Sequence, residues 1–192
     1  MDQARVLLGG GIGSGKSAAA SVFGLLGAAV LSADRAAHRA LEPGGGAADG
    51  VGARWPEAAA QGRIDRRALA EQVFGDPAAL AELESLTHPV IARLLAEEVA
   101  AARARVVIVE MPLPIDLLGP GWRWLVVDAP DDLRLSRLVG RGMSREEALQ
   151  RMEVQPSRDE WLERADLVVD NRGSLADLET ECLKAWKVIL QW

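Results

Sequence analysis

Apolar runs alternate with stretches of helical periodicity along most of the 192-residue chain. Several of the runs are continuously apolar, which is typical of parallel strands that are buried on both faces. The expected strands are 5–9, 29–32, 105–110, 124–128 and 167–170. Helical patterns lie between them, notably over 16–26, 131–139 and 174–190. This β-α-β order predicts an α/β fold in three α/β/α layers, with about five parallel strands in the central sheet.

Two segments interrupt the alternation. The first, 34–104, has no clear strand pattern, and its stretch 42–52 is rich in glycine and alanine and is expected to be a loop. Its helical patterns cover 66–74, 77–86 and 89–102. The second segment, 141–164, is short, charged and helical. We therefore expect a single domain over 1–192, with a helical insertion over 35–103 and a short one over 141–164. The core then comprises 1–34, 104–140 and 165–192.

Composition narrows the class of protein. The net charge of −6 disfavours broad nucleic-acid binding. No stretch approaches the ~20 apolar residues of a membrane-spanning helix, and the N-terminal apolar run is too short for a signal peptide. The lone cysteine, Cys182, indicates a reducing compartment without a disulfide framework. We expect a soluble, cytoplasmic protein, a monomer or weak homo-oligomer, with small-molecule partners and neither nucleic acid nor membrane.

The most specific motif follows the first expected strand. It reads G-x-x-x-x-G-K-S and is followed by a helical pattern, which is the strand–loop–helix context of a phosphate-binding P-loop. Glycines let backbone N–H groups converge on phosphate oxygens, and the helix N-terminus adds positive potential. The residues expected to bind ATP phosphates are Gly10, Gly11, Ile12, Gly13, Ser14, Gly15, Lys16, Ser17 and Ala18.

Lysine usage supports this interpretation. Only three of the 22 basic residues are lysines, and one of them is Lys16. A compact ammonium suits this position better than a broad guanidinium, and it would reach the β- and γ-phosphates. The Ser17 hydroxyl would bind Mg²⁺. In a P-loop kinase, the insertion 35–103 would bind the phosphoryl acceptor and 141–164 would form a mobile lid.

An acidic residue follows the second strand. Asp34 lies at a strand's carboxyl end, where open α/β sheets place their ligands. There a carboxylate can accept the proton of an acceptor hydroxyl, so we expect a general base. The alternative is a helix N-cap before Arg35, and one residue can serve both purposes.

Further charged residues have two interpretations each. Glu110 ends the third strand and either acts on Mg²⁺ through water or simply faces solvent. Arg137, Arg141 and Arg145 share one face if their helix is continuous, and one or two of them could cover the phosphates; the alternative is ordinary solvated arginine.

The chain has two histidines. His38 is expected on an exposed helical face. His88 precedes Pro89, and proline favours the first position of a helix, so the pair is expected to open one. Taken alone, His88 is more often a capping or packing residue than a catalytic one.

Taken together, these motifs resemble those of the dephospho-coenzyme A kinase family. The similarity covers GGIGSGKS at 10–17, the segment 33–44, GRIDRRALAEQVFGDP at 62–77, LTHP at 86–89 and ADLVVDN at 165–171. It implies that Mg·ATP phosphorylates the ribose 3′-hydroxyl of dephospho-coenzyme A, the final step of coenzyme A biosynthesis. By matched position, Asp34 would be the base, and His88 and Arg141 would bind or stabilise the transferring charge. The ATP site would also include Arg137 and Asn171.

The chain departs from the family pattern at several positions. Ser32 replaces an aspartate, Gly9 replaces a common threonine, and Pro114 and Asp116 stand in a stretch that usually carries leucine and glutamate. In the expected lid, Trp161 replaces a basic residue, which predicts weaker nucleotide or acceptor binding. Arg158 or Arg164 could substitute for the lost cation.

Two other functions stay open on the sequence. One is a P-loop kinase of another small hydroxyl compound, such as a nucleoside monophosphate or a sugar acid. The other is a non-catalytic ATP-binding relative that binds a partner protein, which the departures at Ser32 and Trp161 motivate.

Overall fold

The computed structural model describes residues 3–60 and 62–192, so residues 1–2 and 61 of the expected core and insertion lie outside the description. The chain divides into two compact units. The sheet unit contains the chain up to Ser32 together with Ala102–Trp192, and the helical unit contains Ala33–Ala101.

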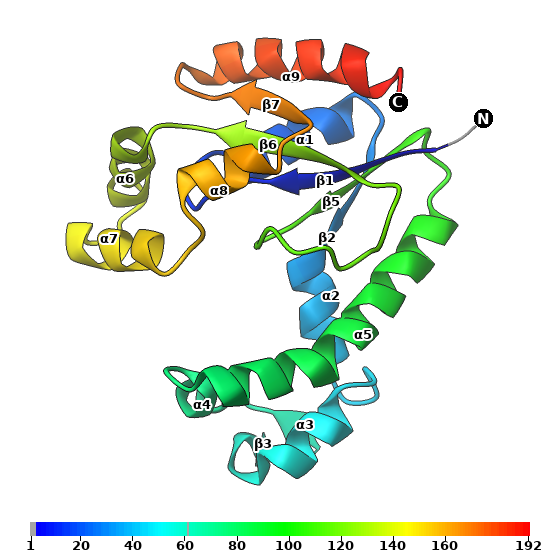
Figure 1. Ribbon diagram of the computed structural model, residues 1–192, viewed down its shortest axis with the longest axis vertical. Coiled ribbons are helices and arrows are strands. Elements are labelled where there is room, and N and C mark those ends of the chain that lie inside the picture. Colours follow the sequence, from blue (N-terminus) through cyan, green and yellow to red (C-terminus); the bar gives the residue numbers. More distant parts are fainter. Residues whose placement is uncertain (1–2, 61) are drawn as a thin grey trace. The chain divides into compact units, whose positions relative to one another are not determined.

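A five-stranded parallel sheet forms the centre of the sheet unit, in the order β2-β5-β1-β6-β7 (Figure 1). The strands are β1 (Ala4–Gly9), β2 (Ala29–Ser32), β5 (Val106–Glu110), β6 (Arg123–Asp128) and β7 (Leu167–Asp170). The five strands predicted from apolar runs are therefore confirmed. Because the strands are parallel, their carboxyl ends share one edge, where Glu110 pairs in register with both Leu8 and Ser32.

Helices cover both faces of this sheet. Helices α1 (Lys16–Leu25) and α9 (Leu175–Ile189) pack on one face and α8 (Arg158–Glu163) on the other. Helices α6 (Asp131–Gly140) and α7 (Arg145–Glu153) pack against each other and against Ile12 of the loop after β1. Alternate residues of a strand point to opposite faces. Leu125 of β6 joins the buried core that includes Phe23 of α1 and Cys182 of α9 (Figure 1). Its neighbour Trp124 packs edge-on against Trp161 of α8, with ring centroids 5.9 Å apart. The predicted three-layer arrangement is thus present.

The condition under which Arg137, Arg141 and Arg145 would share one face, a continuous helix, is not met. Helix α6 ends at Gly140, and Gly142 adopts a φ of 93°, which an α-helix does not allow. Helix α7 then begins afresh, with the Ser144 hydroxyl accepting a hydrogen bond from the Glu147 N–H. Arg145 therefore lies on a different helix from Arg137.

The helical unit is richer in structure than its sequence suggested. It contains α2 (Ala33–Ala40), α3 (Ala48–Arg54), a 3₁₀ turn (Pro56–Ala58), β3 (Ala59–Ala60), β4 (Arg63–Ile64), α4 (Arg66–Val73) and α5 (Pro77–Ala101). The second half of the expected 42–52 loop is helical, and the β3–β4 hairpin was not anticipated. Two-residue strands are too short to show periodicity, and packing of Val51 and Trp55 into a small core supports α3 despite its glycines.

Helix α5 corrects a further expectation. The sequence predicts separate helices over 77–86 and 89–102, whereas one helix contains Pro89 in its interior. Buried Thr87 and Ile91 anchor the backbone on either side, and the Thr87 hydroxyl donates to Leu83 O at 2.8 Å. Proline removes one internal hydrogen bond and favours a bend, and α5 bends along its length in Figure 1. His88 consequently lies inside a helix rather than at its start.

Candidate phosphate-binding and acceptor sites

The glycine-rich loop joins β1 to α1 and has a backbone that side chains would disrupt. Gly10, Gly13 and Gly15 adopt φ values of 137°, 79° and 102°. A Cβ on Gly10 would also lie 2.8 Å from Ser14 Oγ, and one on Gly15 would overlap the amide of Asn171. Glycine at these positions thus permits a turn whose amides lie at the N-terminus of α1, the arrangement that binds phosphate.

The two polar residues that end the motif are held at the sheet edge. The Lys16 ammonium donates to Gly10 O within the same loop. The Ser17 hydroxyl donates to Glu110 Oε1 at 3.0 Å. Glu110 is half-buried and contacts the loop's serine, so it is not an acid that only faces solvent. Two oxygen groups suited to a hard divalent cation therefore lie side by side.

Sequence reasoning missed two residues that hold the loop. Arg134 of α6 is 4 % exposed and donates from Nε to Ile12 O at 2.9 Å, while the Gln155 side chain accepts from the Ile12 N–H at 2.8 Å. Both the N–H and the carbonyl oxygen of Ile12 are thus held by side-chain hydrogen bonds. Arg134 precedes the core-facing Leu138 by four residues, and an arginine on the buried face of a helix is the signal that could have revealed it. Gln155 gave no such signal.

Next to the loop lies a cavity of about 270 Å³ with two guanidinium groups. Five of the predicted residues line it, namely Gly15, Ala18, Arg137, Arg141 and Asn171. Arg137 donates to Asn171 O at 2.9 Å, and buried Asn171 donates to Ser14 O at 2.6 Å. Burial, and then the charge of Arg141, lower the pKa of Arg137. In the described part of the chain neither arginine has a carboxylate partner, so the cavity favours an anion.

Trp161 is a buried core residue next to the phosphate loop. Its side chain is 2 % exposed, and a Cβ on Gly9 would overlap its ring. The departures at positions 9 and 161 therefore share one space: the indole fills the volume that a larger residue 9 would need. The expected substitutes for the lost cation are already engaged. Arg158 binds the buried Asp128 carboxylate at 2.6 and 2.7 Å, and Arg164 contacts Asp116 at 3.4 Å.

The candidate acceptor residues belong to the helical unit. Asp34 is the second residue of α2 and is exposed, so it lies in the first turn rather than at the N-cap. The chain reaches it two residues after Ser32, the strand residue that pairs with Glu110. His38, four residues further on, is exposed as predicted, and His88 is half-buried in α5.

The parallel sheet, the P-loop and the adjacent arginine cavity define a P-loop kinase fold. A shikimate kinase from Acinetobacter baumannii has the same fold, with a TM-score of 0.52 over 98 % of this chain and 94 % of that one, at 16 % identity. The sequence model of dephospho-CoA kinase matches residues 4–177, and the chain belongs to the dephospho-CoA kinase family. It is accordingly a kinase.

Individual relatives agree with the family match. A dephospho-CoA kinase of Frankia casuarinae is 39 % identical over 95 % of this chain and 82 % of its own length. One of Thermus thermophilus is 43 % identical over 92 % and 86 %. A crystal structure from Thermus thermophilus superposes with a TM-score of 0.84 at 40 % identity, covering 98 % of each chain.

Proposed function

We propose that this protein transfers the γ-phosphoryl group of ATP to the ribose 3′-hydroxyl of dephospho-CoA, forming CoA and ADP in the final step of CoA biosynthesis. Membership of the family over residues 4–177 carries this conclusion. The intact phosphate loop supports it, because phosphoryl transfer depends chiefly on positioned phosphates and positive charge.

The sheet unit supplies the ATP-binding groups. Amides of the loop and the Lys16 ammonium would hold the β- and γ-phosphates, with Lys16 released from its contact with Gly10 O. Arg137 and Arg141 would provide positive charge beside the same loop, and Asn171 keeps Arg137 in place. Arg141 would stabilise the charge that develops on the transferring group.

The donor set also fits Mg²⁺. The Ser17 hydroxyl would bind the ion directly and Glu110 would act through water, since oxygen ligands and retained waters are what this cation prefers. When bound, Mg²⁺ would neutralise phosphate charge during transfer.

The acceptor half of the reaction is assigned to the helical unit. The 3′-oxygen attacks the γ-phosphorus, the bond to the β–γ bridging oxygen breaks, and ADP leaves with that electron pair. Asp34 would take the hydroxyl proton as the new bond forms, because its exposed carboxylate is available as an acceptor. His88 would help to bind the acceptor.

The test is incubation of the purified protein with Mg·ATP and dephospho-CoA, followed by chromatography and mass spectrometry for the 3′-phosphorylated product. Lys16→Ala should abolish product formation, whereas Lys184→Ala should not, because Lys184 is an exposed partner of Glu181. ATP binding without product would contradict the proposal and direct attention to other hydroxyl acceptors or to a non-catalytic role.

We also propose a cytoplasmic, monomeric or weakly self-associating enzyme that acts on small molecules. In the described residues, no helix is long and apolar enough to span a membrane. The buried Cys182 thiol, whose pKa burial raises to about 11, suits a reducing compartment. Light scattering after gel filtration would measure the oligomeric state.

A further inference from the structure

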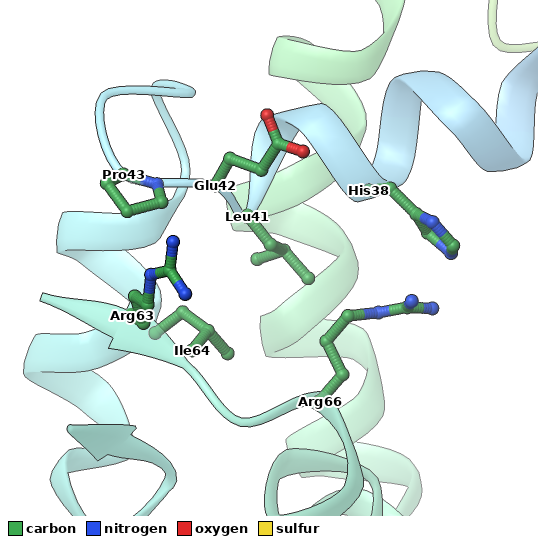
Figure 2. Close-up of a pocket in the computed structure, with 7 residues that line it drawn as sticks. All are labelled: His38, Leu41, Glu42, Pro43, Arg63, Ile64 and Arg66. Carbon is green, nitrogen blue, oxygen red and sulfur yellow. The ribbon is translucent and has the colours of Figure 1, made fainter.

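The helical unit contains a cavity of about 590 Å³ that no step above uses (Figure 2). The end of α2 forms one side of it, and β4 with the start of α4 forms the other. Its walls include His38, Leu41, Glu42, Arg63, Ile64 and Arg66. In Figure 2 the His38 ring and the Arg66 guanidinium extend toward the same side, and the Glu42 carboxylate points away from both.

The two arginines of this cavity differ from most others in the unit. Elsewhere in the helical unit, arginines are neutralised by glutamates, in the pairs Arg39–Glu98, Arg54–Glu82, Arg67–Glu71 and Arg93–Glu97. Arg63 and Arg66 have no acidic partner among the residues that the structure describes. Arg63 and Arg66 both line this cavity, and in Figure 2 the His38 imidazole lies on the side of Arg66. Two unneutralised guanidinium groups in one cavity favour a ligand with two negative charges.

The position of the cavity relative to Asp34 limits what that ligand is. Asp34 and His38 are four residues apart on α2, so they lie on the same face, about 6 Å apart along the helix axis. If Asp34 receives the proton of the 3′-hydroxyl, a substrate group near His38 is attached close to that ribose. In dephospho-CoA, the group that meets this requirement and carries two negative charges is the 5′-diphosphate.

We propose that this cavity binds the diphosphate of dephospho-CoA, with Arg63 and Arg66 as its charged ligands and His38 as a further donor. The inference rests on the function proposed above. The half-buried Leu41 and Ile64 in the same wall provide apolar surface for the start of the uncharged pantetheine arm. The cavity thereby selects a nucleoside whose 5′-position carries a substituted diphosphate.

Titration calorimetry of dephospho-CoA binding tests this directly. Arg63→Gln and Arg66→Gln should each weaken binding roughly tenfold, and the double variant more, because each removes a charge-assisted bond to phosphate. Binding of ATP should not change. Arg67→Gln is the matched control, since Arg67 lies in the same first turn of α4, is paired with Glu71 and does not line the cavity.

Adenosine, which lacks the diphosphate, is the second probe, measured with the ATP site saturated by a non-hydrolysable ATP analogue so that it reports on the acceptor site alone. Its binding should be unaffected in the double variant, and circular dichroism should show an unchanged fold. Equal losses for both ligands, or no loss for dephospho-CoA, would overturn the proposal. Because binding is measured without turnover, a wild-type protein that binds dephospho-CoA through these arginines but never phosphorylates it would refute the proposed function alone.

Discussion

Gly9, at the end of β1, is explained by the neighbouring Trp161 rather than by its own backbone. A Cβ there would lie 3.0 Å from the Trp124 ring and would overlap the Trp161 ring. Both indoles are nearly fully buried and pack edge-on, so neither has room to move away. The small residue and the large one are therefore a matched pair in the core.

Gly9→Ala is expected to destabilise the protein by about 1–3 kcal/mol, because a methyl group is forced into a filled space. Chemical denaturation would measure the loss. Combining it with Trp161→Leu should cost less than the sum of the two single changes, since the smaller side chain frees that space. Strictly additive costs would show that the two residues are not coupled.

Asp34→Asn should lower kcat by at least ~10² while leaving the KM for ATP nearly unchanged, because a positioned base is lost and the phosphate loop is not touched. Steady-state kinetics with both substrates would measure this. Asp49→Asn is the control, since Asp49 is likewise the second residue of its helix and exposed. Full kcat in Asp34→Asn would rule out a base at this position.

Helix α8 packs on the sheet through Trp161 and is also held there by the Arg158–Asp128 ion pair. Asp128 at the end of β6 is 8 % exposed and receives both donated hydrogen bonds of the Arg158 guanidinium. The hydrogen bond to Asp128 is the main reason that the pKa of Arg158 is raised. The pair anchors the first residue of α8, three residues after Gln155, which contacts the phosphate loop.

Asp128→Asn should cost about 1–2 kcal/mol of folding stability. Breaking a fully buried pair costs more, but the Arg158 side chain is 33 % exposed and remains partly hydrated. Urea denaturation would measure the change. Asp116→Asn removes the exposed pair with Arg164 and should change stability by less than ~1 kcal/mol. Equal effects of both changes would contradict a special role for Asp128.

In the molecule as a whole, the groups assigned to ATP belong to the sheet unit and those assigned to the acceptor belong to the helical unit. Each ligand can therefore be probed separately. The sheet unit contains the hydrogen bonds of Arg134 and Gln155 to Ile12. It also contains the Arg137–Asn171 contacts and the cavity beside them. Nucleotide binding should consequently stabilise the fold without an acceptor.

Saturating Mg·ATP, at about 100 times its Kd, should add about 2.7 kcal/mol to stability and raise Tm by ~5–10 °C for a chain of this size. Differential scanning fluorimetry would record the shift. Adenosine should give a smaller shift because it lacks the phosphates, and Lys16→Ala should greatly reduce the effect of ATP. An equal shift in that variant would show that the loop is not the main anchor.

The sequence by itself determined the parallel sheet, the phosphate loop and the family, because continuous apolar runs and a glycine-rich motif report on local structure. It also indicated Asn171 and Arg137 as part of one site, which the cavity brings together. Helical periodicity could single out Arg134 as a buried arginine, but the sequence could not show that Arg134 and Gln155 both contact Ile12, because these contacts join positions more than 100 residues apart.

Tertiary packing also decided points where local rules mislead. The buried side chains of Thr87 and Ile91 hold α5 as one helix on both sides of Pro89, although proline usually ends a helix. The packing role of Trp161 could not be foreseen, since only the folded core places its ring over Gly9. Arg63 and Arg66 line one cavity, and in the described chain neither contacts a carboxylate. Which arginines are paired with a carboxylate depends on the tertiary fold and cannot be seen in the sequence.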